Sequence, residues 1–437
     1  MLTALAYLMI LVFMTLIMTK RMSAMIALIV VPIVFGLLAG FGLELGPMML
    51  DGIKKLAPTG VMLMFAILYF GVMIDAGLFD PVVRAILKIV GNDPMKIVVG
   101  TFILAVMVSL DGDGSTTYMI TCAAMLPLYK RLGISRLVLA CVVMMAGQLM
   151  NILPWGGPTA RVGSALGLDM GQLFVPMILP MVVTGAWGVF VAFILGRRER
   201  RRLGAIAPLA PLDEVDLAGD EAARQLARPR LLWINFALTV ALMVLLILGT
   251  VPLQVLFMVA SSLALMINYP SLQQQKERIA EHAANILPVV SLIFAAGIFV
   301  GVLSGTKMVD AIAASVISGV PNWLGPYMAI VTAVLSVPFT FFISNDAFYF
   351  GILPILAKAA AVYGFSAAEI GRASLIGQQV HLLSPLVAST YLLVGLAGVE
   401  FGDHQRFTLL WALSAAVVML AACIVLGVIP ITVHVAG

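Results

Sequence analysis

The sequence predicts an all-α integral membrane protein with about ten spanning helices and two re-entrant hairpins, arranged as two inverted repeats. Three observations predict this fold class: the composition, a series of long apolar runs, and polar positions that recur after about 230 residues. Hydrophobic residues make up 62% of the 437 residues and charged residues only 11%, whereas soluble proteins carry about 25% charged residues. These charges are too few to cover a water-facing surface, and a net charge of +4 does not indicate nucleic-acid binding. The composition therefore excludes secreted, nucleic-acid-binding and cytosolic-enzyme classes.

Continuous apolar runs locate the spanning helices, each of which needs ~20 apolar residues. The first run has no charged segment and no small-residue cleavage site before Lys20, so it is interpreted as a retained helix and not as a signal peptide. Two longer stretches, 137–166 and 373–399, contain Pro and Gly and are predicted to be broken helices. The uninterrupted runs are 2–19, 22–42, 58–79, 173–196, 231–249, 251–268, 286–304 and 408–430.

The region 97–129 consists of two apolar arms, 97–110 and 116–129, on either side of a polar centre. Each arm would reach ~21 Å as a helix, which is short of a hydrocarbon core of ~30 Å. We therefore expect a re-entrant hairpin whose polar tip lies at mid-membrane. A second hairpin is expected at about 326–362, with Asp346 at its tip.

Lysine and arginine set the orientation, because the cytoplasmic ends of spanning helices carry an excess of both. Residues 197–202 read RRERRR, so the linker 197–230 is placed in the cytoplasm. Five crossings precede this linker, which places both termini outside and leaves Arg161 at membrane depth. The basic residues that face outward in this arrangement are Lys54, Lys55, Lys307, Lys358 and Arg372.

Polar and glycine positions match between residues 1–196 and 231–437, two halves that the linker 197–230 joins. Each half has three helices, a hairpin, a broken helix and a last helix, and an odd number of crossings turns the second copy upside down. Inverted repeats with broken helices are typical of secondary transporters, whose site lies near mid-membrane where the repeats meet. The matching positions are Phe65-Ala66 with Phe294-Ala295, Asp80 with Asp310, Asp113 with Asp346, Gly147-Gln148 with Gly377-Gln378, and Asn151 with His381.

Charged residues at bilayer depth indicate function, because burying them in the membrane is costly. Asp111 and Asp113 lie at the first predicted tip, Asp346 at the second, and Arg161 in the first broken helix. Arginine can bind a carboxylate through two hydrogen bonds, and aspartate can bind a proton or a hard divalent cation. Alternative roles remain open: Arg161 pairs with an Asp to hold the fold, Asp111 caps a half-helix, and His381 is a packing residue.

Breaks in helices expose backbone N–H and C=O groups that can bind an anion or a cation, and nearby hydroxyls add further ligands. Residues at the two tips and the two breaks form the predicted substrate site. They are Arg161, Ser115, Thr116, Thr117, Asn151, Gly156, Gly157, Thr159, Ser344, Asn345, Ser384, Ser389 and Thr390. Asp111, Asp113, Asp346 and His381 are the candidates for proton or metal coupling, with Asp113 and Asp346 as the metal ligands.

Motifs of other protein classes are missing from the sequence. It contains no G-x-x-x-x-G-K-[ST] loop for ATP, no G-x-S-x-G and no H-E-x-x-H. The three cysteines, Cys122, Cys141 and Cys423, lie in apolar runs without metal-ligand spacing and are predicted to be packing residues. An enzyme is therefore not expected. A passive channel is the remaining alternative of a different class, and it would conduct without saturation.

Three polar strings in apolar surroundings resemble the citrate–metal:proton symporter family, CitMHS, of the ion transporter superfamily. They are GPMMLDGIKKLAPTG at 46–60, SLDGDGSTT at 109–117 and NILPWGGPTAR at 151–161. The resemblance implies import of citrate complexed with a divalent metal ion, coupled to protons, by a homodimer with an elevator motion in a bacterial inner membrane. It also implies that no cofactor is permanently bound, because the metal, Mg²⁺, Ca²⁺ or similar, is part of the cargo.

The tips differ from those of related sodium-coupled dicarboxylate carriers, which have Ser-Asn-Thr at both positions. This chain has Asp-Gly-Ser-Thr at 113–116 and Ser-Asn-Asp at 344–346, which favours protons or a co-transported metal over sodium. Citrate carries three negative charges and its complex with a divalent cation one, so one arginine beside two or three aspartates suits the complex. A proton-coupled di- or tricarboxylate carrier without a metal requirement, or another anion carrier of the superfamily, is the alternative.

Overall fold

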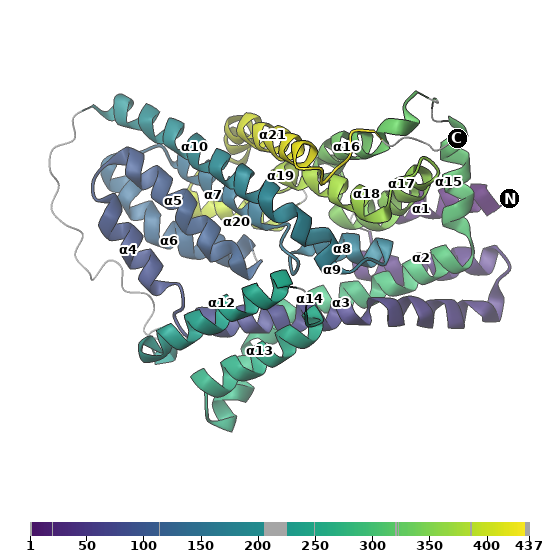
Figure 1. Cartoon of the computed structure of the whole chain (residues 1–437), viewed down its shortest axis with the longest axis horizontal. Helices are drawn as coiled ribbons and strands as arrows, with labels where there is room; N and C mark the ends of the chain where they lie inside the picture. The colour runs from purple at the N-terminus through teal and green to yellow at the C-terminus, as the bar shows by residue number, and fades with distance from the viewer. Residues whose placement is uncertain are drawn as a thin grey trace.

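The computed structural model describes residues 2–19, 21–112, 114–204, 225–248, 250–319, 321, 323–384 and 387–432. Within these residues the chain is all-helical and contains no β-strand, so the predicted fold class is confirmed (Figure 1). The helices of the first half are α1 (Leu2–Met18), α2 (Ala24–Leu38), α3 (Leu45–Asp75), α4 (Asp80–Val90), α5 (Pro94–Val108), α6 (Gly114–Leu132), α7 (Arg136–Met150), α8 (Gly157–Leu166), α9 (Met170–Phe174) and α10 (Ile178–Leu203).

The second half repeats the order of long helix, short helix, hairpin, broken helix and last helix. Its helices are α12 (Leu232–Leu248), α13 (Leu253–Asn268), α14 (Leu272–Gly305), α15 (Met308–Gly319), α16 (Met328–Phe342), the π-helical turn η7 (Ala347–Ile352), α17 (Leu353–Ala361), α18 (Ala367–Ser374), the 3-10 turn η8 (Leu375–Gly377), α19 (Gln378–His381), α20 (Ala388–Ala397) and α21 (Phe401–Val425).

Six helical segments in the described part of the chain are long and apolar enough to cross a membrane. Others that the sequence assigned as spans are shorter: α1 has 17 residues, α2 has 15 and α13 has 16. At 1.5 Å per residue these reach ~22–26 Å, close to the lower limit for a spanning helix. The six segments are Gly42–Asp75, Met170–Leu203, Pro229–Leu248, Leu272–Gly305, Gly325–Phe342 and Phe401–Val425.

Two long helices, α3 and α14, run side by side along the long axis of the molecule (Figure 1). They have 31 and 34 residues and begin well before the apolar runs at 58–79 and 286–304 that predicted them. Their first halves are polar, and Gln, Glu and Lys favour helix almost as well as apolar residues do, so hydropathy alone placed the helix starts too late. Each helix contains a proline at the corresponding place, Pro58 and Pro288.

The contact between α3 and α14 is made by glycines. A Cβ atom built on Gly52 would lie 1.9 Å from the carbonyl oxygen of Gly297, and one built on Gly301 would lie 2.3 Å from that of Met48. Farther along, a Cβ on Gly71 would lie 2.5 Å from Nδ1 of His282. The two helices are therefore antiparallel, and their backbones touch where no side chain fits.

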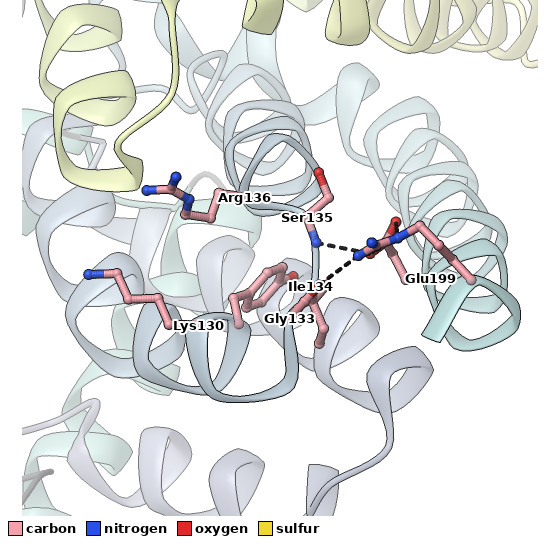
Figure 2. Close-up of a pocket in the computed structure, with 8 residues that line it drawn as sticks. Lys130, Gly133, Ile134, Ser135, Arg136 and Glu199 are labelled. Carbon is pink, nitrogen blue, oxygen red and sulfur yellow. Dashed lines mark hydrogen bonds and ion pairs between the residues drawn. The ribbon is translucent and has the colours of Figure 1, made fainter. Parts of the chain in front are cut away.

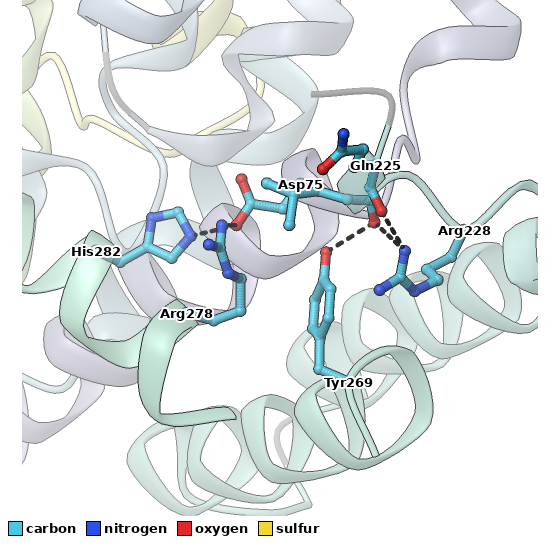
Figure 3. Close-up of polar contacts among 7 residues, drawn as sticks. Asp75, Gln225, Arg228, Tyr269, Arg278 and His282 are labelled. Atoms are coloured by element: carbon cyan, nitrogen blue, oxygen red, sulfur yellow. Dashed lines mark hydrogen bonds and ion pairs between the residues drawn. The ribbon is translucent and has the colours of Figure 1, made fainter. Parts of the chain in front are cut away.

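The C-terminal ends of α3 and α13 and the N-terminal part of α14 meet in a polar cluster, drawn in Figure 3. Oδ2 of Asp75 accepts a hydrogen bond from Nη1 of Arg278 at 3.2 Å and lies 2.9 Å from Nε2 of His282. The backbone N–H of Arg228 donates to the carbonyl of Ala76, and its guanidinium lies over the ring of Tyr269, 4.9 Å from the centroid. The end of the linker is thus bound to both halves of the molecule.

Helix α7 occupies the core, since every side chain from Val138 to Met150 is buried. It packs against α5 and α10 of the first half and against α19, α20 and α21 of the second. Its buried end leads directly into the first helix break, at Asn151. The break is therefore held at the centre of the molecule and not at its surface.

Candidate functional site

The first hairpin is formed by α5 and α6, which have 15 and 19 residues, longer than the arms that the sequence predicted. The turn between them needs Gly112, whose φ of 78° is left-handed. Oγ1 of Thr117 donates to Oγ of Ser109 at 3.1 Å and closes the turn. Asp113 lies outside the described residues, as do the side chains of Asp111 and Ser115; the backbone of Thr116 lies in the first turn of α6.

The second hairpin turns between α16 and η7, at the tip that the sequence predicted at 344–346. Oγ of Ser344 accepts a hydrogen bond from the backbone N–H of Ala347 at 3.1 Å, which begins the next helical segment. Asn345 and Asp346 follow Ser344 with their side chains partly exposed. Their amide and carboxylate groups are therefore accessible at the tip.

Both broken helices are closed by a threonine hydroxyl. Oγ1 of Thr159 donates to the carbonyl of Ile152 at 2.8 Å, and Oγ1 of Thr390 donates to that of Leu382. Each bond satisfies a carbonyl that the break leaves without a helical partner. The two hydroxyls predicted to bind substrate are thus bound to backbone in this structure. Ser384 is buried in the second break.

Glycines shape the first break around Arg161. A Cβ on Gly156 would lie 2.2 Å from the carbonyl oxygen of Asn151, so only glycine fits there. A Cβ on Gly157 would lie 2.7 Å from Nη1 of Arg161, because the arginine side chain folds back over the first turn of α8. The two glycines therefore make room for the backbone turn and for the guanidinium.

Arg161 forms an ion pair with Asp346, which joins the first break to the second hairpin tip. Nε of Arg161 lies 2.6 Å from Oδ1 of Asp346, and the two side chains are 19% and 16% exposed. This exposure keeps the pair accessible to a ligand. The pairing with an aspartate is the alternative that the sequence left open for Arg161, and the partner comes from the other half of the chain.

A network of amides lies beside this pair. Gln378 accepts a hydrogen bond from Nδ2 of Asn151 at 3.2 Å and donates to Oδ1 of Asn345 at 3.0 Å and to the hydroxyl of Tyr349 at 2.7 Å. It thereby connects the first break, the second tip and the start of the second broken helix. Gln378 and Tyr349 were not predicted as site residues, although the sequence had marked Gln378 as the repeat partner of Gln148.

His381 is bound to an arm of the second hairpin. Its Nδ1 lies 2.6 Å from the carbonyl oxygen of Thr340, and the side chain is buried. This contact corresponds to the packing role that the sequence left open. It places the imidazole behind the second tip, on the side of α16.

The first tip contacts both breaks. Nε1 of Trp155 donates to the carbonyl of Leu110 at 2.9 Å, which links the first tip to the first break. A Cβ on Gly114 would lie 3.6 Å from Oγ of Ser389, at the start of α20. Each tip therefore lies against a break from the opposite half. Among the described side chains, no group of three or more His, Cys, Asp or Glu is placed to hold a metal ion.

Comparisons with known proteins show which family the chain resembles. The model of the family CitMHS, described as "Citrate transporter", matches residues 3–377. A "Citrate transporter" of Bacillus subtilis is 59% identical over 429 residues, covering 98% of this chain and all of that protein. A "Mg(2+)/citrate complex secondary transporter" of the same organism is 52% identical over an alignment of 438 residues, covering 99% of this chain and all of that protein.

Two solved structures share the fold at low sequence identity. The YdaH transporter of Alcanivorax borkumensis has a TM-score of 0.60 and 15% identity, covering 88% of each chain. MtrF of Neisseria gonorrhoeae has a TM-score of 0.55 and 13% identity, covering 90% of this chain and 86% of that one. Both structures support the fold alone.

Proposed function

Because the chain belongs to the citrate transporter family CitMHS, we propose that it imports citrate as a complex with a divalent metal ion, in symport with protons. The observation that carries the proposal is the ion pair between Arg161 and Asp346 at the meeting point of a helix break and a hairpin tip. The relative that is named for the Mg(2+)/citrate complex, at 52% identity, supports the metal as part of the cargo. The family is one of transporters and not of enzymes.

Substrate binding in this proposal is an exchange of partners. In the structure Asp346 neutralises Arg161, which avoids leaving either charge alone in a partly buried place. A carboxylate of citrate takes the place of Asp346 on the guanidinium, and the aspartate then turns to the metal ion that citrate carries. Asn151 and Asn345, already linked through Gln378, lie where amide groups can bind the remaining oxygens.

The charges at the site fit the complex better than the free anion. Fully ionised citrate carries three negative charges and its complex with a divalent cation one. The described site offers one arginine that is already neutralised by one aspartate. Carboxylate oxygens are good ligands for Mg²⁺ and Ca²⁺, so Asp346, with Asp113 and Asp111 at the first tip, would hold metal or protons. His381 would support the second tip.

A carrier of free di- or tricarboxylates is the second candidate. The same ion pair supports it. The carboxylate of Asp346 lies 2.6 Å from Arg161 and is therefore a weaker ligand for a metal ion. In that case the aspartates at the tips would serve protons alone. The requirement for metal separates the two candidates.

Uptake of labelled citrate into proteoliposomes tests the proposal. Under an inward proton gradient we expect uptake with Mg²⁺ or another divalent ion and a loss of at least tenfold when a chelator removes it. Uptake measured with Mg²⁺, Ca²⁺, Mn²⁺ or Zn²⁺ ranks the four ions. The ranking reflects the size of the site and its set of ligands. Equal uptake with and without metal would replace the proposal by the free-carboxylate carrier, and flux without saturation would indicate a channel.

The aspartates at the tips give a second test. Asp346→Asn keeps the shape of the side chain but removes the charge that a metal ion or proton needs, so we expect the metal and pH dependence of uptake to flatten. Asp113→Asn is expected to have the same effect. Asp310→Asn is the matched control. Asp310 is exposed and lies outside the site, and its Oδ1 is 3.0 Å from Nζ of Lys358. Wild-type metal and pH profiles in both tip variants would remove the aspartates from the site.

We also propose the wider setting that the sequence predicts. The spanning-length helices and the bacterial relatives support a multi-pass protein of the bacterial cytoplasmic membrane. The basic segment 197–202 supports a cytoplasmic linker with both termini outside. A homodimer that moves its hairpins and broken helices as an elevator completes the proposal.

A further inference from the structure

A cavity of about 590 Å³ lies where the end of α6, the turn into α7 and the end of α10 meet (Figure 2). Lys130 lies 16 residues from the start of α6 at the first hairpin tip, or ~24 Å along the helix. The cavity is therefore separate from the transport site. It is an open hollow at the surface of the molecule, lined mainly by polar and charged groups.

One wall of the cavity is a closed ion pair. Oε2 of Glu199 accepts hydrogen bonds from the backbone N–H of Ser135 at 2.9 Å and from Nη2 of Arg202 at 2.6 Å. Arg202 also donates to the carbonyl of Gly133 at 2.6 Å. The pair joins the end of α10 to the turn between α6 and α7.

The other wall carries two positive charges that the pair does not compensate. Lys130 and Arg136 are exposed, and neither forms an ion pair with any residue that the structure describes. Figure 2 shows both side chains extending to the same side, away from Glu199. Arg136 also begins α7, a helix of 15 residues whose first N–H groups favour an anion. This side of the cavity is thus suited to a negatively charged group.

Exposed apolar residues of α6 share a helical face with Lys130. Met119 is 49% exposed, and Ala123 and Lys130 follow it on the same stripe of α6, four and eleven residues farther along the helix. Met119 and Ala123 lie nearer the hairpin tip, which is predicted at mid-membrane, and Lys130 lies at the basic end of α6. A ligand with a charged head and an apolar tail fits this stripe better than a free anion.

We propose that this cavity, which the topology proposed above places on the cytoplasmic side, binds the phosphate headgroup of an anionic phospholipid in the leaflet that faces the cytoplasm. Basic pockets between spanning helices on the cytoplasmic side bind such headgroups, and each Lys or Arg near the surface contributes about 1 kcal/mol. Lys130 and Arg136 contact the phosphate, while Glu199 and Arg202 hold the wall in place. The bound lipid would stabilise the junction of the first hairpin with α7 and α10.

Thermal unfolding of the purified protein in non-ionic detergent tests this proposal. Titration with phosphatidylglycerol is expected to raise the melting temperature of the wild-type protein, whereas phosphatidylcholine leaves it unchanged. Removing both charges in the Lys130→Gln/Arg136→Gln double variant is expected to weaken the apparent affinity for phosphatidylglycerol by about 30-fold. The matched control is Arg84→Gln/Lys88→Gln, which removes two exposed charges of the same kinds from α4 on the same predicted side.

The outcomes distinguish a bound anionic lipid from a nonspecific effect of charge or detergent. Equal phosphatidylglycerol affinity in the two double variants would overturn the proposed lipid site, because Lys130 and Arg136 would then contribute no more to binding than other basic residues on that side. Equal stabilisation by phosphatidylcholine would overturn the need for negative charge. Equal stabilisation by inorganic phosphate at the same concentration would replace the lipid by a soluble anion. Both double variants retain the transport site, so these results do not depend on citrate uptake.

Discussion

Replacing Arg161 by alanine is expected to lower the kcat/KM of citrate uptake by at least ~100-fold. In the proposed function the guanidinium binds a citrate carboxylate, and each hydrogen bond to a charged group contributes about 1.5–3 kcal/mol. Losing two such bonds corresponds to a factor of this size. The measurement is labelled-citrate uptake in proteoliposomes, normalised to the amount of folded protein in the membrane.

The same substitution leaves the partly buried Asp346 without its partner, which costs up to about 3–5 kcal/mol of folding free energy, the value for a fully buried pair. The double variant Arg161→Gln/Asp346→Asn separates the two effects, because it removes both charges and restores neutrality. If it folds but does not transport, the charged pair is needed for transport and not for stability alone. Restored uptake in the double variant would instead assign Arg161 to stability alone. Lys358→Ala, which breaks an exposed ion pair with Asp310, is the control and should change uptake less than twofold.

Gly52→Ala is expected to destabilise the protein more than an alanine at any other glycine of α3. The new Cβ would lie 1.9 Å from the carbonyl oxygen of Gly297 and 2.8 Å from the Cα of Gly301, so the backbone of α14 would have to move. Overpacking usually costs about 1–3 kcal/mol, and contact with backbone instead of a flexible side chain places this case at the upper end. Thermal unfolding and the fraction of monodisperse protein after size-exclusion chromatography measure the effect.

Gly46→Ala provides the matched control on the same helix. Nothing lies within 4 Å of a Cβ at Gly46, and the residue is exposed. Alanine favours helix over glycine by up to about 1 kcal/mol, so this variant should be as stable as the wild type or slightly more so. Equal stability of the two variants would show that α3 and α14 are not held by backbone contact.

Interruptions of the apolar pattern predicted the fold well, whereas helix ends were predicted poorly. The second tip at 344–346 and the first break after Asn151 lie where Pro, Gly and polar residues enter an apolar run. Such residues are costly in a membrane unless backbone groups find partners, so their positions are informative. The start of α3 at Leu45 was missed because helix propensity continues through polar residues that hydropathy excludes.

The sequence identified the charged groups of the site but not their pairing. Arg161 needs a partner at membrane depth, and three aspartates at the two tips were available to it. Choosing among them requires knowledge of how the two halves pack. That packing places Oδ1 of Asp346 2.6 Å from Nε of Arg161, although the two residues are 185 positions apart in the sequence. Gln378 could be recognised as a repeat position, yet a neutral amide within an apolar run gives no signal of which groups it will join.

The ion pair across the two halves also has a consequence for biosynthesis. Asp346 follows Arg161 by 185 residues, so at about 5–20 residues per second it is synthesised roughly 10–40 s later. Over that interval the first half holds an arginine at the predicted membrane depth without its final counterion, which costs at least a few kcal/mol. Insertion of the second half removes this cost, so completing the site and completing membrane integration are one event in the assembly of the molecule.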